Sequence, residues 1–175
     1  MDDYPVSGRL GTNSLGTGAR SLRRPHFPAT MRGLNSLRRL RFLVAEDNEG
    51  DVHWLRMVLV QAGAFFTLSV VSDGAQARDF LLRRGDYAGV PQQDLIFLDL
   101  NLPKLSGLEV LRQVPGSDRM PICIVSGSEG QRELVTREFG IRRIAYIVKP
   151  VDRMKILNCF RCYDHLRSLA DQLSM

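Results

Sequence analysis

The chain has 175 residues, 44% of them hydrophobic, so it is long enough to bury one complete core and still carry an extension. Its formal net charge of +5 belongs to residues 1–39, which hold seven arginines and two aspartates, while the remaining 136 residues balance 17 basic against 17 acidic side chains. The folded part therefore gives no electrostatic reason to expect nucleic-acid binding, and no apolar run approaches the roughly 20 residues that a membrane-spanning helix needs.

The N-terminal segment is expected to lack a stable fold. Residues 1–38 are rich in Gly, Ser, Thr, Pro and Arg and show no sustained periodicity. They contain no apolar stretch of the kind found in secretory signals, and Asp2 and Asp3 argue against a targeting peptide. A basic arm for anionic partners and a non-native extension ahead of a start at Met31 are the alternatives. We expect a folded domain over 39–170 and a short tail over 171–175.

Strands and helices alternate through the first half of the predicted domain. Short apolar or β-branched runs predict strands over 41–45, 65–71 and 95–98. Apolar residues at helical spacing predict helices over 51–62 and 75–84. The turn signal "SDG" precedes the second helix, and a polar loop over 85–93 follows it.

The alternation continues to the C-terminus. Strands are predicted over 121–125 and 144–148, and helices over 107–113 and 129–139, with Gly140 in the position of a C-cap. Asp152 caps one last helix. Apolar residues recur along that helix at the spacing of a buried face: Ile156, Leu157, Phe160, Tyr163, Leu166 and Leu169.

This order of elements predicts the fold class. Strands that are apolar throughout and alternate with helices indicate a parallel sheet that is covered on both faces. Right-handed crossovers then produce a doubly wound α/β fold with a five-stranded parallel sheet, most simply in the flavodoxin-like order 2-1-3-4-5.

Polar side chains stand where the predicted strands end. Glu46 and Asp47 follow the first strand, Asp99 the third, Ser126 the fourth and Lys149 the fifth. Because ligands bind beyond the carboxyl ends of the strands in such a sheet, we expect these groups to converge on one crevice. Each has an ordinary reading alone, as a helix cap, a turn serine or a loop lysine. Together, in chain order and at strand ends, they indicate a site.

Clustered carboxylates repel one another unless a cation joins them, and Mg²⁺ takes oxygen ligands. Asp47, Asp99 and the main-chain carbonyl of Asn101 could supply three of these ligands. Asp99 could then attack an electrophilic phosphorus atom, with Lys149 and Ser126 binding the phosphoryl oxygens, to form an aspartyl phosphate.

The three cysteines indicate a reducing compartment. Cys123 lies in an apolar run, and Cys159 and Cys162 form a C-x-x-C pattern inside a predicted helix. No second pair or neighbouring histidines complete a metal site, so we expect ordinary core or surface thiols. The absence of a disulfide framework fits a cytoplasmic protein.

Four stretches carry a family resemblance: "LVAEDN" (43–48), "FLDLNLPKLSGLEVL" (97–111), "PICIVSGS" (121–128) and "AYIVKP" (145–150). Through them the chain resembles, over about 40–170, the receiver domain of two-component response regulators, related to the chemotaxis response regulator. The stretch "LDLNLPK" after a long loop is similar to small stand-alone regulators that are paired with phytochrome-type histidine kinases.

The resemblance implies a role for each matching residue. Asp99 is the phosphoacceptor, Lys149 holds the phosphoryl group, and a cis peptide bond precedes Pro150. Asp47 binds Mg²⁺ directly and Glu46 through water. The roles implied for the remaining matches are a metal-binding carbonyl and a side chain facing the attacking water for Asn101, a switch hydroxyl for Ser126 and a switch aromatic for Tyr146.

The sequence also departs from the family. Ser126 follows Asp99 by only 27 positions, which predicts a shortened third helix, and the helix over 129–139 has few apolar residues. The last helix carries more apolar residues than one core-facing stripe needs. We therefore expect homodimerisation or partner docking through the face formed by the fourth helix, the fifth strand and the fifth helix.

Three functions compete. The first is a stand-alone phosphoacceptor switch, not an enzyme, which is phosphorylated by a histidine kinase with Mg²⁺ as cofactor. The second is the receiver part of a truncated DNA-binding regulator, although about ten residues after the last helix would be too few for a helix-turn-helix module. The third is a metal-dependent phosphatase, which would need an aspartate where the chain has Asn101.

Overall fold

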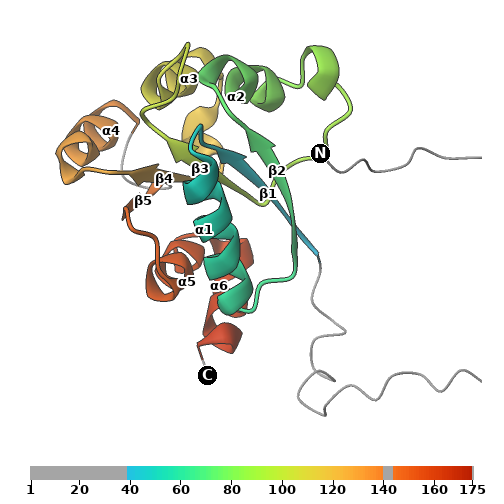
Figure 1. The fold of residues 1–175 in the computed structure, drawn as a ribbon, viewed down its shortest axis with the longest axis vertical. Helices are drawn as coiled ribbons and strands as arrows, with labels where there is room; N and C mark the ends of the chain where they lie inside the picture. Colours follow the sequence, from blue (N-terminus) through green and yellow to red (C-terminus); the bar gives the residue numbers. More distant parts are fainter. Residues whose placement is uncertain (1–38, 140–143, 175) are drawn as a thin grey trace, which may run out of the picture. The chain divides into compact units, whose positions relative to one another are not determined.

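The computed structural model describes residues 39–139 and 144–174. One sheet of five parallel strands has the order β2-β1-β3-β4-β5, which confirms the predicted order (Figure 1). The strands are β1 (Leu40–Ala45), β2 (Phe66–Val71), β3 (Leu95–Asp99), β4 (Ile122–Ser126) and β5 (Ile144–Val148).

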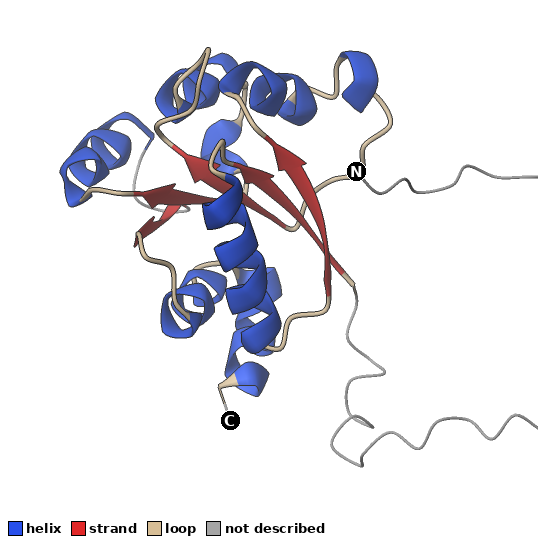
Figure 2. Cartoon of the chain, viewed as in Figure 1, coloured by secondary structure: helices blue, strands red, loops and turns tan. Residues whose placement is uncertain are grey.

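Helices cover both faces of the sheet. They are α1 (Glu49–Gln61), α2 (Gly74–Leu81), α3 (Gly107–Gln113), α4 (Arg132–Phe139), α5 (Arg153–Arg161) and α6 (Asp164–Leu173), with single 3₁₀ turns η3 (Gly85–Tyr87), η4 (Ser117–Arg119) and η5 (Glu129–Gln131). Helices α1, α5 and α6 pack on one face and α2, α3 and α4 on the other (Figure 2). None of the described helices is both long and apolar enough to cross a membrane.

The central strands are apolar throughout because each strand feeds two cores. Phe42 and Val44 of β1 join the core beneath α1, α5 and α6, whereas their neighbours Leu43 and Ala45 join the core beneath α2, α3 and α4. This alternation follows from the period of two along a strand. Burial on both faces fixes the strand register and, with it, which residue stands at each carboxyl end.

Gly107, the first residue of α3, lets this helix start directly against the end of β3. Its N–H group donates a hydrogen bond of 3.0 Å to the carbonyl of Leu100. A Cβ atom at Gly107 would lie 2.4 Å from the carbonyl oxygen of Asp99, closer than any side chain tolerates. The missing side chain therefore allows α3 to support the strand end that carries Asp99.

The prediction of one continuous last helix is wrong. The chain turns at Cys162 and Tyr163 and forms two helices, and α6 runs to Leu173, beyond the predicted domain end at 170. The Tyr163 hydroxyl donates a hydrogen bond to the carbonyl of Ile122 and accepts one of 3.1 Å from the N–H group of Ala145. Anchoring this ring at the start of β4 and β5 requires a break that helical periodicity cannot reveal.

The break also explains the apparent excess of apolar residues on the last predicted helix, from which dimerisation was expected. Phe160, Tyr163 and Leu166 are 0, 5 and 0% exposed, so they belong to the core of this chain and are not a surplus. Because α5 and α6 each present a stripe to the sheet, the apolar residues that seemed too many for one helix are shared by two.

Other helix boundaries differ by shorter stretches. Helix α2 ends at Leu81, three residues before the predicted end, and the 3₁₀ turn η3 occupies part of the predicted polar loop. The segment predicted as one helix over 129–139 starts as η5 before α4 begins. The predicted C-cap at Gly140 lies outside the described residues.

Candidate functional site

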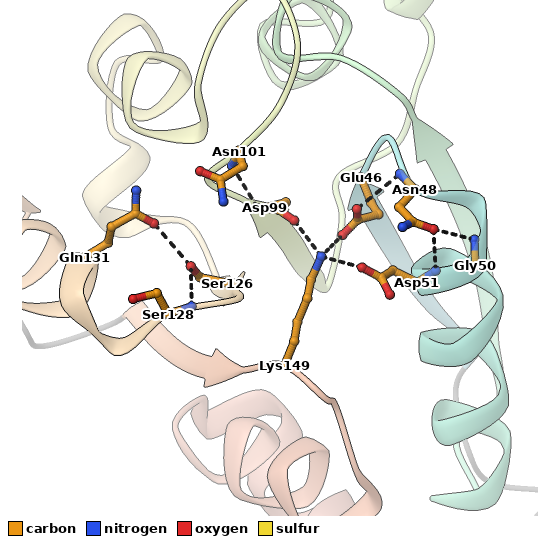
Figure 3. Close-up of polar contacts among 10 residues, drawn as sticks. All are labelled: Glu46, Asn48, Gly50, Asp51, Asp99, Asn101, Ser126, Ser128, Gln131 and Lys149. Atoms are coloured by element: carbon orange, nitrogen blue, oxygen red, sulfur yellow. Dashed lines mark hydrogen bonds and ion pairs between the residues drawn. The ribbon is translucent and has the colours of Figure 1, made fainter.

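The ammonium group of Lys149, which follows β5, lies among three carboxylates (Figure 3). Its Nζ atom is 2.6 Å from Oδ2 of Asp99, 2.7 Å from Oε2 of Glu46 and 2.7 Å from Oδ2 of Asp51. The peptide bond between Lys149 and Pro150 is cis, as the family resemblance implies. Residues from β1, α1, β3 and β5 thus meet at the carboxyl edge of the sheet, where the sequence predicts the site.

Most of the charge in this cluster is buried, which is unfavourable unless the charges are paired. The side chains of Glu46 and Asp99 are each 6% exposed and that of Lys149 is 22% exposed. Charges taken out of water need partners, and one ammonium cannot neutralise three carboxylates. The cluster as a whole therefore carries more negative than positive charge.

The pKa values reflect this balance. Burial alone would lower the pKa of Lys149, but its hydrogen bonds to Asp51, Asp99 and Glu46 outweigh burial and raise it above the ordinary value. Burial raises the pKa of Glu46, and the negative charge of Asp99 adds to this rise, while the hydrogen bond from Lys149 opposes it.

Asp99 is held in place at both of its oxygens. Oδ2 contacts Lys149, and Oδ1 accepts a hydrogen bond of 2.8 Å from the main-chain N–H group of Asn101. The carboxylate therefore has a defined orientation at the end of β3. Asn101 itself is exposed in the loop that follows this strand.

Ser126 and Tyr146 belong to a second group of contacts, joined through Ser128. The fully buried Ser126 hydroxyl donates to Oε1 of Gln131 at 3.2 Å and accepts from the N–H group of Ser128 at 3.3 Å (Figure 3). The Tyr146 hydroxyl donates to the Ser128 carbonyl. The Arg132 guanidinium lies 4.8 Å from the centre of the Tyr146 ring. Neither side chain takes part in the contacts of Lys149.

The structure brings together Glu46, Asp99 and Lys149, as the sequence predicts. Asp47 is exposed and takes no part in the ion pairs of Lys149. Sequence reasoning missed Asp51, the third partner of Lys149, and Gln131, the partner of Ser126. Asp51 could have been found as an acid in the first turn of the helix that follows β1, since this turn begins at the same sheet edge.

The donor atoms suit a hard divalent cation, although their arrangement is not a finished metal site. No three histidine, cysteine, aspartate or glutamate side chains of the described residues are grouped to hold a metal ion. Lys149 instead takes the central position among the carboxylates. All candidate donors are oxygen atoms, which Mg²⁺ prefers, and the cluster carries uncompensated negative charge, so the residues present fit Mg²⁺ chemically. The three thiols are free cysteines elsewhere in the fold.

A cavity of about 440 Å³ opens at the cluster. Glu46, Asp51, Asp99 and Lys149 line one part of it, and Trp54 of α1 stands at its wall. The indole N–H group of Trp54 donates a hydrogen bond of 2.7 Å to the carbonyl of Val151, so this ring joins α1 to the loop after β5. A phosphoryl-sized group could reach Asp99 through this opening.

A comparison with protein families matches residues 42–161 to the response regulator receiver domain. Among individual proteins, the chain is 33% identical over 96 residues to response regulator Rcp1 of Synechocystis, a match that covers 53% of this chain. The chain spans 65% of the length of Rcp1, and 46% of the length of TctD, a transcriptional regulatory protein of Salmonella typhimurium to which it is 32% identical.

Solved structures show the same fold. The bacteriophytochrome response regulator RtBRR superimposes with a TM-score of 0.63 at 28% identity, covering 78% of this chain and 94% of RtBRR. The phosphorylated cyanobacterial phytochrome response regulator RcpA has a TM-score of 0.56 at 26% identity and covers 78% and 89%. The Mn²⁺-bound form of Rcp1 has a TM-score of 0.55 at 28% identity and covers 77% and 88%.

Proposed function

The chain belongs to the response regulator receiver domain family, and on this premise we propose that it accepts a phosphoryl group on Asp99 from a sensor histidine kinase and acts as a stand-alone switch in a two-component phosphorelay. The observation that carries the proposal is the position of Asp99, a buried carboxylate at the end of β3 whose two oxygens are oriented by Lys149 and the N–H group of Asn101. The phosphorylated form of RcpA, which shares this fold, supports the proposal that the chain is phosphorylated.

The transfer is a displacement at phosphorus. An oxygen of Asp99 attacks the phosphorus atom of a phosphohistidine, the new P–O bond forms as the P–N bond breaks, and the leaving imidazole nitrogen takes up a proton. Lys149 is placed to bind a phosphoryl oxygen once its contact with Asp99 is given up. The product is an acyl phosphate on Asp99.

Mg²⁺ is the cofactor that the donor atoms fit. Asp47, Asp99 and the carbonyl of Asn101 would hold it, with Glu46 acting through a bound water. When bound, the cation neutralises charge that develops on the phosphoryl oxygens. The exposed position of Asp47 leaves its carboxylate open to a hydrated cation. The Mn²⁺-bound form of Rcp1, which shares this fold, supports the binding of a divalent cation.

In this proposal the protein is not an enzyme that acts on other molecules. Its chemistry is limited to gaining the phosphoryl group and losing it to water, with the side chain of Asn101 facing the attacking water. Hydrolysis breaks the P–O bond, releases inorganic phosphate and restores the carboxylate of Asp99.

Ser128 would link the phosphorylation of Asp99 to the two switch residues, Ser126 and Tyr146. To bond a phosphoryl oxygen, the Ser126 hydroxyl must leave Gln131, and this movement pulls on the N–H group of Ser128. The carbonyl of the same residue holds the Tyr146 hydroxyl. A shift at Ser126 is therefore linked to the rotamer of Tyr146, which biases a two-state equilibrium of the surrounding surface.

The output surface proposed here is the α4–β5–α5 face, used for homodimerisation or partner docking. A groove of about 460 Å³ lies on this face, and its lining includes Arg132 of α4, Tyr146 of β5 and Lys155 of α5. This groove, and not a surplus of apolar residues on α5, now supports the proposal. Sedimentation that shows the same monomer with and without beryllofluoride, and no partner bound, would count against it.

The input proposed here is a phytochrome-type histidine kinase in the cytoplasm. RtBRR and RcpA are phytochrome response regulators, and they share this fold at 28% and 26% sequence identity. The free thiols of the described residues fit a reducing compartment.

Two other functions are alternatives to the stand-alone switch. The receiver part of a longer DNA-binding regulator is favoured by the match to TctD, of which the chain spans 46%. A metal-dependent phosphatase is disfavoured because Asn101 stands where that chemistry needs an aspartate.

One experiment tests the central proposal. The protein is incubated with Mg²⁺ and a small phosphodonor such as acetyl phosphate, beside the variant Asp99→Asn. We expect the wild-type protein alone to gain a phosphate that hydroxylamine removes. Equal labelling of both proteins, or none of either, would refute the assignment of Asp99.

A further inference from the structure

Asp51 contacts Lys149 as closely as the two carboxylates to which the family resemblance gives a role. Its Oδ2 atom is 2.7 Å from Nζ, the same distance as for Glu46. It differs from Glu46 and Asp99 in exposure, since its side chain is 43% exposed and theirs are 6% exposed. Asp51 is therefore the partner of Lys149 that stands at the mouth of the site.

The local structure explains why Asp51 is free to reach Lys149. An acid at the third position of a helix ordinarily turns back to the N–H group of the N-cap residue. In α1 the N-cap is Asn48, and its N–H group donates to Oε1 of Glu46 at 3.2 Å instead. The Asn48 side chain accepts from the N–H group of Asp51 at 3.2 Å, so the backbone is capped while the carboxylate of Asp51 points into the site.

This placement has an electrostatic consequence. A phosphoryl group that binds Lys149 must displace or share the contact with Asp51. The carboxylate of Asp51 also adds a negative charge next to the position where the phosphoryl oxygens would bind. The same charge attracts a cation to the site.

We infer that Asp51 is a positioning residue which holds Lys149 away from incoming phosphoryl groups, so that it slows phosphorylation by anionic donors while it strengthens the binding of Mg²⁺. The inference rests on the proposed function of Asp99. The competing reading is purely structural, because an acid in the first turn of a helix also stabilises the helix dipole. If Asp51 had only a structural role, its loss would not make phosphorylation faster and Mg²⁺ binding weaker at the same time.

The variant Asp51→Asn removes the charge and keeps the shape of the side chain. Glu49→Gln is the matched control, since Glu49 is an exposed acid in the same helical turn and is not among the ion pairs of Lys149. Asp51→Glu keeps the charge and should behave as the wild-type protein. Circular dichroism checks that all variants are folded.

Two readouts are measured for each protein. The first is the rate of phosphorylation by acetyl phosphate at low and at high salt. The second is the Kd of Mg²⁺, followed through the fluorescence of Trp54, the single tryptophan of the chain, which lines the same cavity.

For Asp51→Asn at low salt we expect phosphorylation to become roughly 3- to 10-fold faster and Mg²⁺ binding roughly 3- to 10-fold weaker, as one partly exposed charge at close range implies. The gain in rate should shrink at high salt, because screening removes the repulsion that Asp51 exerts. Glu49→Gln should leave both quantities within about twofold of wild type, since exposed charges off the site are well screened.

The outcomes separate this inference from the proposed function. If wild type is phosphorylated on Asp99 and Asp51→Asn changes neither quantity, or moves both in the same sense, the role of Asp51 is overturned and that of Asp99 stands. If wild type is not phosphorylated, the proposed function fails, and the phosphorylation part of the inference fails with it. Glu49→Gln matching Asp51→Asn would also overturn the inference.

Discussion

Replacing Lys149 with methionine tests the charge balance at the centre of the site. Lys149→Met keeps an unbranched side chain of similar length and removes the ammonium that holds Glu46, Asp51 and Asp99 together. Removing one partner of a buried ion pair costs about 3–5 kcal/mol. Because Lys149 is 22% exposed and Asp51 43% exposed, we expect a loss below this range, about 2–3 kcal/mol of unfolding free energy at neutral pH.

The assay is urea denaturation followed by circular dichroism, with a chelator present. Two additions should restore part of the lost stability in Lys149→Met. Mg²⁺ should do so because a cation replaces the missing positive charge. Lower pH should do so because burial raises the pKa of Glu46, and the variant removes Lys149, which opposes this rise more than the N–H group of Asn48 does. A carboxyl whose pKa is higher in the folded state than in the unfolded state binds protons more readily when folded, so stability rises as pH falls towards the ordinary value of the group.

A loss below about 0.5 kcal/mol, which is the size of an ordinary surface change, would refute the reasoning. It would mean that water, and not Lys149, satisfies the three carboxylates. Lys104→Met serves as the comparison, since Lys104 is 64% exposed and pairs with a single carboxylate, that of Asp73.

Three further predictions follow from single contacts. Gly107→Ala places a Cβ atom 2.4 Å from the carbonyl oxygen of Asp99. The unfolding free energy should therefore fall by about 1–3 kcal/mol, and phosphorylation should become slower. Gly89→Ala is the control, because its Cβ atom meets nothing within 4 Å and should change neither quantity. Tyr163→Phe leaves two buried main-chain groups without their partner and should cost about 2 kcal/mol in urea denaturation, and a loss near zero would contradict the anchoring role of this hydroxyl. The pKa of Lys149 is raised in the folded protein, so its contribution to stability is complete below the ordinary lysine pKa and is lost as pH rises above that value. Raising the pH into this alkaline range should therefore lower the unfolding free energy of the wild-type protein more than that of Lys149→Met.

The sequence by itself determined the order of the five strands, the class of the sheet and three members of the site. Runs that are apolar on both faces indicate strands buried in a parallel sheet, and the first polar residue after such a run must stand at its carboxyl edge. Glu46, Asp99 and Lys149 could be placed together for this reason, and the structure confirms the placement.

Only the tertiary structure decided the contacts that depend on the direction of a side chain. Asp51 and Gln131 lie on helical turns, where the sequence shows an acid and an amide but not which neighbour each one faces. Asp47 follows the same strand as Glu46, yet Asp47 is exposed and Glu46 is buried. The break between α5 and α6 depends on a hydrogen bond from Tyr163 to the start of β4, 41 residues earlier in the chain. Such long-range contacts leave no periodic trace in the sequence, because they are set by the packing of elements and not by the pattern within one of them.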